Sequence, residues 1–272
     1  MKKLIYQIYY SEATKEANDK GFIPLDNLSN LRPDWQEYWP IRNYLLNLVD
    51  DKDCLLGFFS PKFFQKTGLN SSEVFSYINE YNDEFDVFTF SPAYDQVAYF
   101  RNVFEQGFIN QPTIDKQTYI KVFSKIDPSV NIENLVMDST TSVFCNYFVA
   151  NVNFWKEWLA NCEKIFELAE FQDSILSNSL NAIVHGSLDQ KTTKPFVIER
   201  VASFMLATNP KWRIKKYDNS SIFSDGVLKN FPFELTELDL LKSLYLKTND
   251  QRYLEFFYVK RTELLDIVNA IK

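Results

Sequence analysis

Hydrophobic positions along the chain fall into short apolar runs that alternate with longer stretches of helical spacing. Short β-branched and aromatic runs are typical of buried strands, and apolar residues three and four positions apart are typical of helices. Alternating strands and helices predict an α/β fold with a largely parallel sheet flanked by helices. The strands are expected at 3–10, 54–60, 86–91, 142–150 and 212–218.

Start and stop signals place the helices between these runs. Ser71 is a cap for a helix over 71–81, and Gly107 ends one over 95–107. Pro40 is expected to delay or kink the helix around it. Further helices are expected over 35–49, 153–171 and 173–185, from 195 onward, and over 234–247 and 250–270. The segment 11–33 is expected to be a long loop, and the segment 108–140 is expected to be mixed and partly helical.

The loop at 218–232 is the expected boundary within the 272-residue chain. We expect an α/β domain over 1–217 and a helical extension over 218–272 packed on it. The first segment, MKKLIYQIYYSEA, is rich in tyrosine and interrupted by Gln7, which is typical of a first strand and not of a signal peptide.

Composition excludes several classes of function. A net charge of −7 argues against nucleic-acid binding and against electrostatic attachment to an anionic membrane. Three cysteines without CxxC spacing suit a reduced, cytosolic protein without structural zinc. With only six glycines, the chain has neither GxGxxG nor GxxxxGK[ST], so a Rossmann dehydrogenase or a P-loop ATPase is not expected.

Carboxylate pairs and the single histidine favour structural roles. The Asp-Lys-Asp at 51–53 has the spacing of a metal pair but precedes its strand, and Asp83 and Asp86 share this defect. We interpret both as solvated charged turns. His185 follows an apolar stretch at a predicted helix end, where it favours the helix dipole.

Polar residues follow several predicted strands. In open α/β sheets, ligands bind beyond the carboxyl ends of the strands, so these residues are expected to surround a site. They are Tyr9, Tyr10, Ser60, Lys62, Ser91, Asp95 and the segment from Asn146 to Asn151.

PFVIERVASF, at 195–204, places two charges in an apolar helical segment. Adjacent residues do not face each other on a helix, so Glu199 and Arg200 each need a separate partner or a cavity. A partly buried carboxylate can serve as a general base with a tuned pKa. The alternative is a buried ion pair with a neighbouring element.

Four segments, in order, resemble motifs of a bacterial glycosyltransferase family that acts in capsule or O-antigen synthesis. They are DWQEYWPIRNYL, LLGFFSPKFF, CNYFVANVNFWKEWL and FVIERVASFML, and the resemblance covers about residues 1–217. The strand CNYFVAN is also similar to one in glycogenin-like enzymes. The resemblance implies a GT-A-like (Rossmann-like) fold and transfer of a sugar from a nucleotide sugar, as in a hexosyltransferase. The chain departs from the family where Ser60, Pro61 and Lys62 replace histidine and arginine.

The resemblance also implies roles for individual residues. Glu199 becomes the catalytic base, and Glu37 with Trp39 would contact the acceptor. Lys66 is a further candidate to replace the missing basic residues. Asp95 would hold Mn²⁺ or Mg²⁺, although the Asp-x-Asp motif is degenerate here and metal-independent transfer stays open. The implied donor-binding residues are Tyr9, Tyr10, Ser60, Lys62, Ser91, Asp95, Asn146 and Arg200.

The expected partners are a nucleotide sugar donor, a glycan or lipid-linked glycan acceptor and other glycan-assembly proteins, with no nucleic acid. The expected location is the cytoplasm, at the periphery of the inner membrane. Two alternatives stay open. One is a non-catalytic glycan-binding or scaffold module of a larger polymer synthase. The other is a small-molecule hydrolase that uses Glu199 with a second carboxylate.

Overall fold

The computed structural model describes residues 1–48, 53–81, 84–172, 174–184, 191–224 and 226–271. Its strands form a six-stranded sheet in the order β2-β1-β3-β5-β4-β6. β1 pairs in parallel with β2 and β3, β4 pairs in parallel with β6, and only β5 runs antiparallel to its neighbours. This confirms an α/β fold with a mostly parallel sheet. The strands are β1 (Lys2–Tyr9), β2 (Ile23–Asp26), β3 (Cys54–Phe59), β4 (Val87–Thr89), β5 (Phe148–Asn151) and β6 (Ile214–Lys216).

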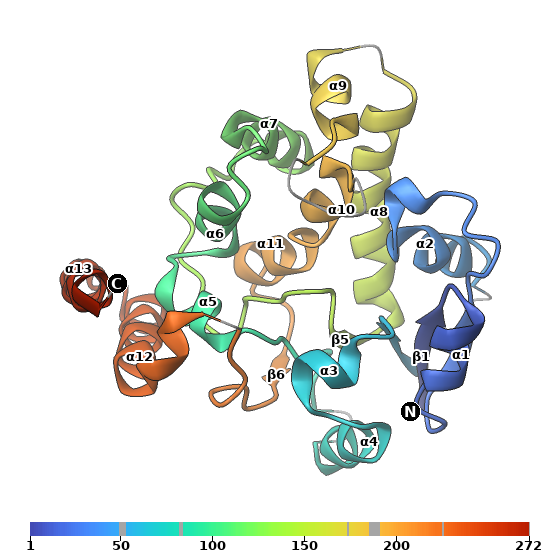
Figure 1. The fold of residues 1–272 in the computed structure, drawn as a ribbon, viewed down its shortest axis with the longest axis horizontal. Helices are drawn as coiled ribbons and strands as arrows, with labels where there is room; N and C mark the ends of the chain where they lie inside the picture. Colours follow the sequence, from blue (N-terminus) through green and yellow to red (C-terminus); the bar gives the residue numbers. More distant parts are fainter. Residues whose placement is uncertain (49–52, 82–83, 173, 185–190, 225, 272) are drawn as a thin grey trace.

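Helices flank this sheet, and several cluster beside it (Figure 1). They are α1 (Glu12–Ala17), α2 (Tyr38–Leu46), α3 (Phe63–Thr67), α4 (Ser71–Glu80), α5 (Tyr94–Tyr99), α6 (Val103–Asn110), α7 (Lys116–Ile126), α8 (Val152–Glu170), α9 (Ile175–Asn181), α10 (Thr193–Ile198), α11 (Val201–Thr208), α12 (Pro232–Thr248) and α13 (Gln251–Ile271), with 3-10 turns η1 (Pro33–Trp35) and η2 (Val227–Asn230).

Both faces of β3 are covered, which explains its uninterrupted apolar run. Phe58 packs edge-on against Trp155 of α8, with ring centroids 4.9 Å apart. The next residue, Phe59, points to the opposite face and stacks at 4.0 Å on Phe63 of α3. Successive side chains of a strand alternate between faces, so a strand covered on both sides is apolar throughout.

Three sequence expectations were wrong in detail. The segment 11–33 contains α1 and β2 as well as loop. The helix expected over 95–107 is two helices, because Asn102 caps a new one by accepting from the N–H groups of Phe104 and Glu105. Gly107 lies inside α6, where an added Cβ would come within 3.3 Å of the Tyr119 hydroxyl. Close packing, and not a helix end, therefore accounts for this glycine.

The strand expected over 142–150 is also shorter and reversed in direction. β5 begins only at Phe148, and residues before it form a loop. Because β5 is antiparallel to β3, its amino end lies at the same edge of the sheet as the carboxyl ends of β3 and of β1, the next strand. Asn146 thus reaches that edge of the sheet. Asn151 lies at the opposite edge, where it donates a hydrogen bond to Asp86.

The C-terminal helices pack on α5, as Figure 1 shows at the end of the molecule away from β1. Leu235 and Leu238 of α12 join a small apolar core with α5 and α13. The buried ammonium of Lys242 donates to the carbonyls of Val97 (2.6 Å) and Phe100 (2.9 Å) at the end of α5. The expected extension over 218–272 therefore contacts the α/β part through both apolar and polar groups. Within the described residues, no helix has the length and apolar character needed to cross a membrane.

Candidate functional site

Two cavities meet at one wall of the molecule. The first has a volume of about 450 Å³ and lies beyond the carboxyl ends of β1 and β3; the second has about 520 Å³ and lies between α3, α5 and α6. Four residues line both cavities and are called the common wall: Lys62, Lys66, Cys145 and Glu199.

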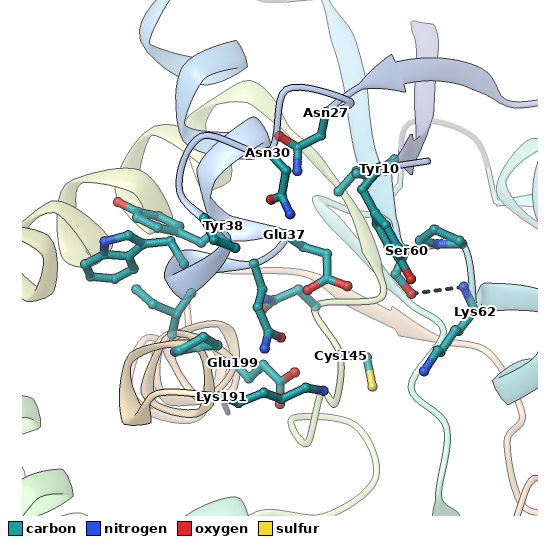
Figure 2. A pocket seen from close by; sticks show the side chains of 18 of the residues that line it. Tyr10, Asn27, Asn30, Glu37, Tyr38, Ser60, Lys62, Cys145, Lys191 and Glu199 are labelled. Carbon is teal, nitrogen blue, oxygen red and sulfur yellow. Dashed lines mark hydrogen bonds between the residues drawn. The ribbon is translucent and has the colours of Figure 1, made fainter. Parts of the chain in front are cut away.

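The first cavity gathers seven of the predicted site residues. It is the edge of the sheet at which the sequence places a site. Figure 2 shows Glu37 and Glu199, from different elements, directing their carboxylates into this cavity. The predicted residues that line it are Tyr10, Glu37, Ser60, Lys62, Lys66, Asn146 and Glu199.

Strand alternation decides between the two candidate tyrosines. Ile8 and Tyr10 both line the first cavity, since residues two apart point to the same side of a strand. Tyr9 points away from it and lies under the ammonium of Lys15, 5.6 Å from the ring centroid. Of the two candidate tyrosines, Tyr10 is therefore the one that lines this cavity.

Ser91 and Asp95 line neither cavity. The Ser91 hydroxyl accepts a hydrogen bond from the Phe144 N–H (2.9 Å). Asp95 is fully buried, and its carboxylate accepts from the N–H of Ser224 (2.6 Å), from the Ser224 hydroxyl and from Gln96. Both residues hold loops in place.

The described residues do not fit a divalent metal ion. Among them, no three histidine, cysteine, aspartate or glutamate side chains come together as a metal site. The oxygens of Asp95 already accept hydrogen bonds. The metal role of Asp95 therefore stays a prediction that the geometry does not support, and no chemical step is derived from it.

Trp39, a predicted acceptor residue, packs away from both cavities. Its ring stacks on Phe166 with centroids 6.4 Å apart. The guanidinium groups of Arg32 and Arg42 lie 5.6 and 5.7 Å from its ring. These contacts join the start of α2 to α8, so Trp39 supports the segment that carries Glu37.

Glu199 and Arg200 do face each other, contrary to the helical projection. Helix α10 ends at Ile198 and α11 begins at Val201, so the two residues lie at a break between helices. Arg200 Nη1 lies 3.3 Å from Glu199 Oε2. Arg200 is 2% exposed and also donates to the carbonyl of Val103 (3.2 Å) and to Gln106 (2.9 Å). It lines the second cavity, not the first.

The acid groups of the first cavity are balanced by lysines. Burial and the nearby charge of Glu199 raise the pKa of Glu37. Burial opposes the charge on Lys66, but the Cys145 side chain and the two carboxylates outweigh it and raise its pKa. Lys66 is therefore a cation at neutral pH. A cation in a cavity beside carboxylates can bind the phosphates of a ligand.

Cys145 is not an activated nucleophile. Its thiol accepts a hydrogen bond from Lys66 (3.0 Å). Burial, followed by the charge of Glu199, raises its pKa to about 11. The thiol therefore stays protonated near neutrality, and nucleophilic cysteine chemistry has no support here.

Residues with a strained backbone conformation are concentrated around the two cavities. Six described residues other than glycine have a positive φ, and all but Asn249 line one of the two cavities. Such conformations cost about 1–3 kcal/mol each for most residues and concentrate at functional sites. The five are Asn30 (38°), Gln36 (48°), Ala93 (61°), Cys145 (61°) and Asn146 (53°).

Asn146 also has an unused acceptor. The residue is 7% exposed and lines the first cavity, and its buried Oδ1 has no hydrogen-bond partner among the described residues. A buried amide oxygen without a partner is costly, so a ligand or water that donates to it stabilises the site.

Sequence reasoning missed part of the site. Asn27 and Asn30 line the first cavity from the segment taken as loop, where asparagines after the short run FIPL were the only signal. It missed the second cavity altogether, because glutamines of α5 and α6 carry no recognisable spacing. His185, Asp83 and most of the Asp-Lys-Asp motif lie outside the described residues. Asp86 forms an ion pair with Arg213 (3.0 Å).

Comparisons with protein families, curated proteins and solved structures find no match to this chain. Function is therefore inferred from the geometry of the two cavities.

Proposed function

We propose that the protein is a GT-A-like glycosyltransferase that moves a sugar from a nucleotide sugar to a bacterial surface-polysaccharide acceptor. The observation that supports this most is the position of Glu199 in the common wall. A group transfer needs two substrates on either side of the reacting atoms, with a base at the point where they meet.

The first cavity suits the donor. Tyr10 offers a ring on which a nucleobase can stack, and Lys62 and Lys66 offer cations for the diphosphate. Asn146 adds an amide with a free oxygen. The resemblance to capsule and O-antigen transferases supports the same orientation, with the nucleotide at the carboxyl edge of the sheet.

Glu199 is proposed as the base of the reaction. Its carboxylate takes the proton of the acceptor hydroxyl as that oxygen forms a bond to the anomeric carbon. The bond from this carbon to the donor phosphate breaks, and the electron pair leaves with the nucleoside diphosphate. Lys62 and Lys66 stabilise the negative charge that develops on this leaving group. Arg200 holds Glu199 in place.

A panel of UDP-, GDP-, dTDP- and CMP-sugars, with and without Mn²⁺, tests the donor site by thermal shift. A ligand that binds the native state raises the unfolding temperature by mass action. We expect at least one donor to stabilise the protein, without a requirement for Mn²⁺. If no donor has an effect, the non-catalytic module is the better explanation.

One observation favours a second candidate, a glycoside hydrolase. Glu37 and Glu199 line the same cavity, and the pKa of Glu37 is raised by burial and by Glu199. Carboxyl groups in contrasting environments can divide the roles of acid and base. A hydrolase releases free sugar in water at full rate without an acceptor, whereas a transferase moves the sugar onto the acceptor and releases the nucleoside diphosphate faster when the acceptor is added.

A further inference from the structure

Apart from the common wall, the second cavity is lined mainly by carboxamides and aromatic rings. Beyond the common wall, the charged side chain that lines it is Arg200, which is already engaged by Glu199, Gln106 and the Val103 carbonyl. Every other lining side chain there is neutral. The amides are Gln65, Gln96, Gln106 and Gln111, and the rings are Phe144 and Phe223.

Two of these amides are held in one orientation. The Gln106 Oε1 accepts from Arg200 Nη2 (2.9 Å), and the Gln111 Oε1 accepts from the Tyr119 hydroxyl (2.7 Å). The Nε2 groups of both make no hydrogen bond within the described part of the chain. Each therefore keeps two N–H donors for a ligand, on a side chain that the protein has already oriented.

Donors of this kind fit hydroxyl oxygens. A sugar ring carries hydroxyls at its rim and C–H groups on its faces, so it suits fixed amides beside an aromatic ring such as that of Phe223, which is partly exposed. An anionic ligand would find its cations only at the common wall, where Lys62 and Lys66 also face the first cavity.

We propose that the second cavity binds an uncharged glycan, with Gln106 and Gln111 donating to its hydroxyl groups. The role of this glycan as acceptor rests on the proposed transferase function, because Glu199 would then meet its terminal hydroxyl. The uncharged character of the glycan does not rest on that function, because it is inferred only from the residues that line the cavity. The proposal excludes an acidic sugar or a lipid diphosphate as the group held between α5 and α6.

Binding can be measured without any donor. Saturation-transfer NMR and calorimetry with maltotetraose, cellotetraose, chitotetraose and mannotetraose probe neutral glycans, and tetragalacturonate is the acidic counterpart. We expect at least one neutral tetrasaccharide to bind, and more tightly than tetragalacturonate. Tighter binding of tetragalacturonate, or no binding of any neutral tetrasaccharide, would overturn the proposal.

Gln106→Glu and Gln111→Glu test the two donors separately. Each variant keeps an oxygen for Arg200 or Tyr119, replaces the free N–H groups by a second oxygen and adds a negative charge. Loss of one hydrogen bond should weaken neutral-glycan binding about tenfold in each variant. Gln117→Glu, an exposed residue of α7, is the charge-matched control and should leave binding unchanged. If one variant fails to fold, the other still decides; unchanged binding in a folded variant contradicts the proposal.

The outcomes separate this inference from the proposed function. Nucleotide sugars that bind without any neutral glycan binding leave the transferase proposal standing and remove this one. A neutral glycan that binds through Gln106 or Gln111, with no nucleotide sugar binding, supports this inference and removes the transferase proposal.

Discussion

Arg200 Nη1 lies 3.3 Å from Oε2 of Glu199, although the two residues are consecutive in the chain. A continuous helix would separate them by about 100°. Both residues keep helical backbone angles at the junction of α10 and α11, and the length of the arginine side chain lets its buried guanidinium reach back to a carboxylate that is 33% exposed. One ion pair thus fixes the position of the proposed base between two cavities.

Arg200→Met should destabilise the protein by about 3 kcal/mol, because it leaves buried acceptors and a partly buried carboxylate without their partner. Urea unfolding measures the loss. Arg213→Met is the matched control: that arginine is 58% exposed in its pair with Asp86, so its loss should cost less than about 1 kcal/mol. Equal losses in the two variants would show that Arg200 contributes no more than a surface charge.

Glu199→Gln should reduce sugar transfer by about 10²–10⁴-fold, because the amide cannot accept the acceptor proton. The amide oxygen can still accept from Arg200, so unfolding temperature and donor-induced thermal shift should stay close to those of the wild type. Turnover is measured as release of nucleoside diphosphate in the presence of acceptor. Glu167→Gln, on the exposed side of α8, is the control. Near-normal turnover in the Glu199 variant would remove it from the mechanism.

Lys66→Met should weaken nucleotide-sugar binding about tenfold or more, because it removes a charged donor from the wall that faces the diphosphate. Isothermal titration with the donor found in the thermal-shift panel measures the change. Lys125→Met, an exposed lysine of α7, should have no effect. If affinity is unaltered in the Lys66 variant, the phosphates lie elsewhere.

Glu37→Gln should change how stability depends on pH. Burial and Glu199 raise the pKa of Glu37 above its ordinary value of 4.5, so the folded protein binds a proton that the unfolded chain has released. Stability contributed by this group is present below pH 4.5 and is lost as pH rises through the folded pKa. The variant should therefore be more stable than the wild type near neutral pH, by urea unfolding, and this difference should vanish in acid. A pH-independent difference would contradict the coupling.

Lys242→Met tests a pH dependence of stability with the opposite sign, in the C-terminal helices. Burial lowers the pKa of Lys242 to about 8 from an ordinary 10.5. Between these values the unfolded chain binds the proton that the folded protein has lost, so the contribution of Lys242 to stability rises with pH through this window. As pH rises from about 8 to 10.5, the free energy of unfolding of the wild type should increase relative to that of the variant. A constant difference would mean that the ammonium is not desolvated.

Local patterns were sufficient for the elements with the strongest apolar signal. β1, β3, α8, α12 and α13 lie where the sequence placed them, since a buried run or a long amphipathic helix depends mainly on its own residues. The capped helix over 71–80 was also found, although Asn70 is its cap and not Ser71. Short elements such as β2 and the division of 95–107 were missed, because neighbouring packing decides them.

The sequence by itself determined an acidic α/β protein, an edge of the sheet rich in polar residues, and an unusual charge pair at Glu199 and Arg200. Only the tertiary structure decided that β5 is antiparallel, that Asp95 is enclosed by Ser224, and that four glutamines line a second cavity. The physical reason is the distance along the chain between the residues that determine each feature. Hydrophobic periodicity records whether a residue is buried, whereas strand direction, helix breaks and cavities arise from contacts between segments distant in the chain.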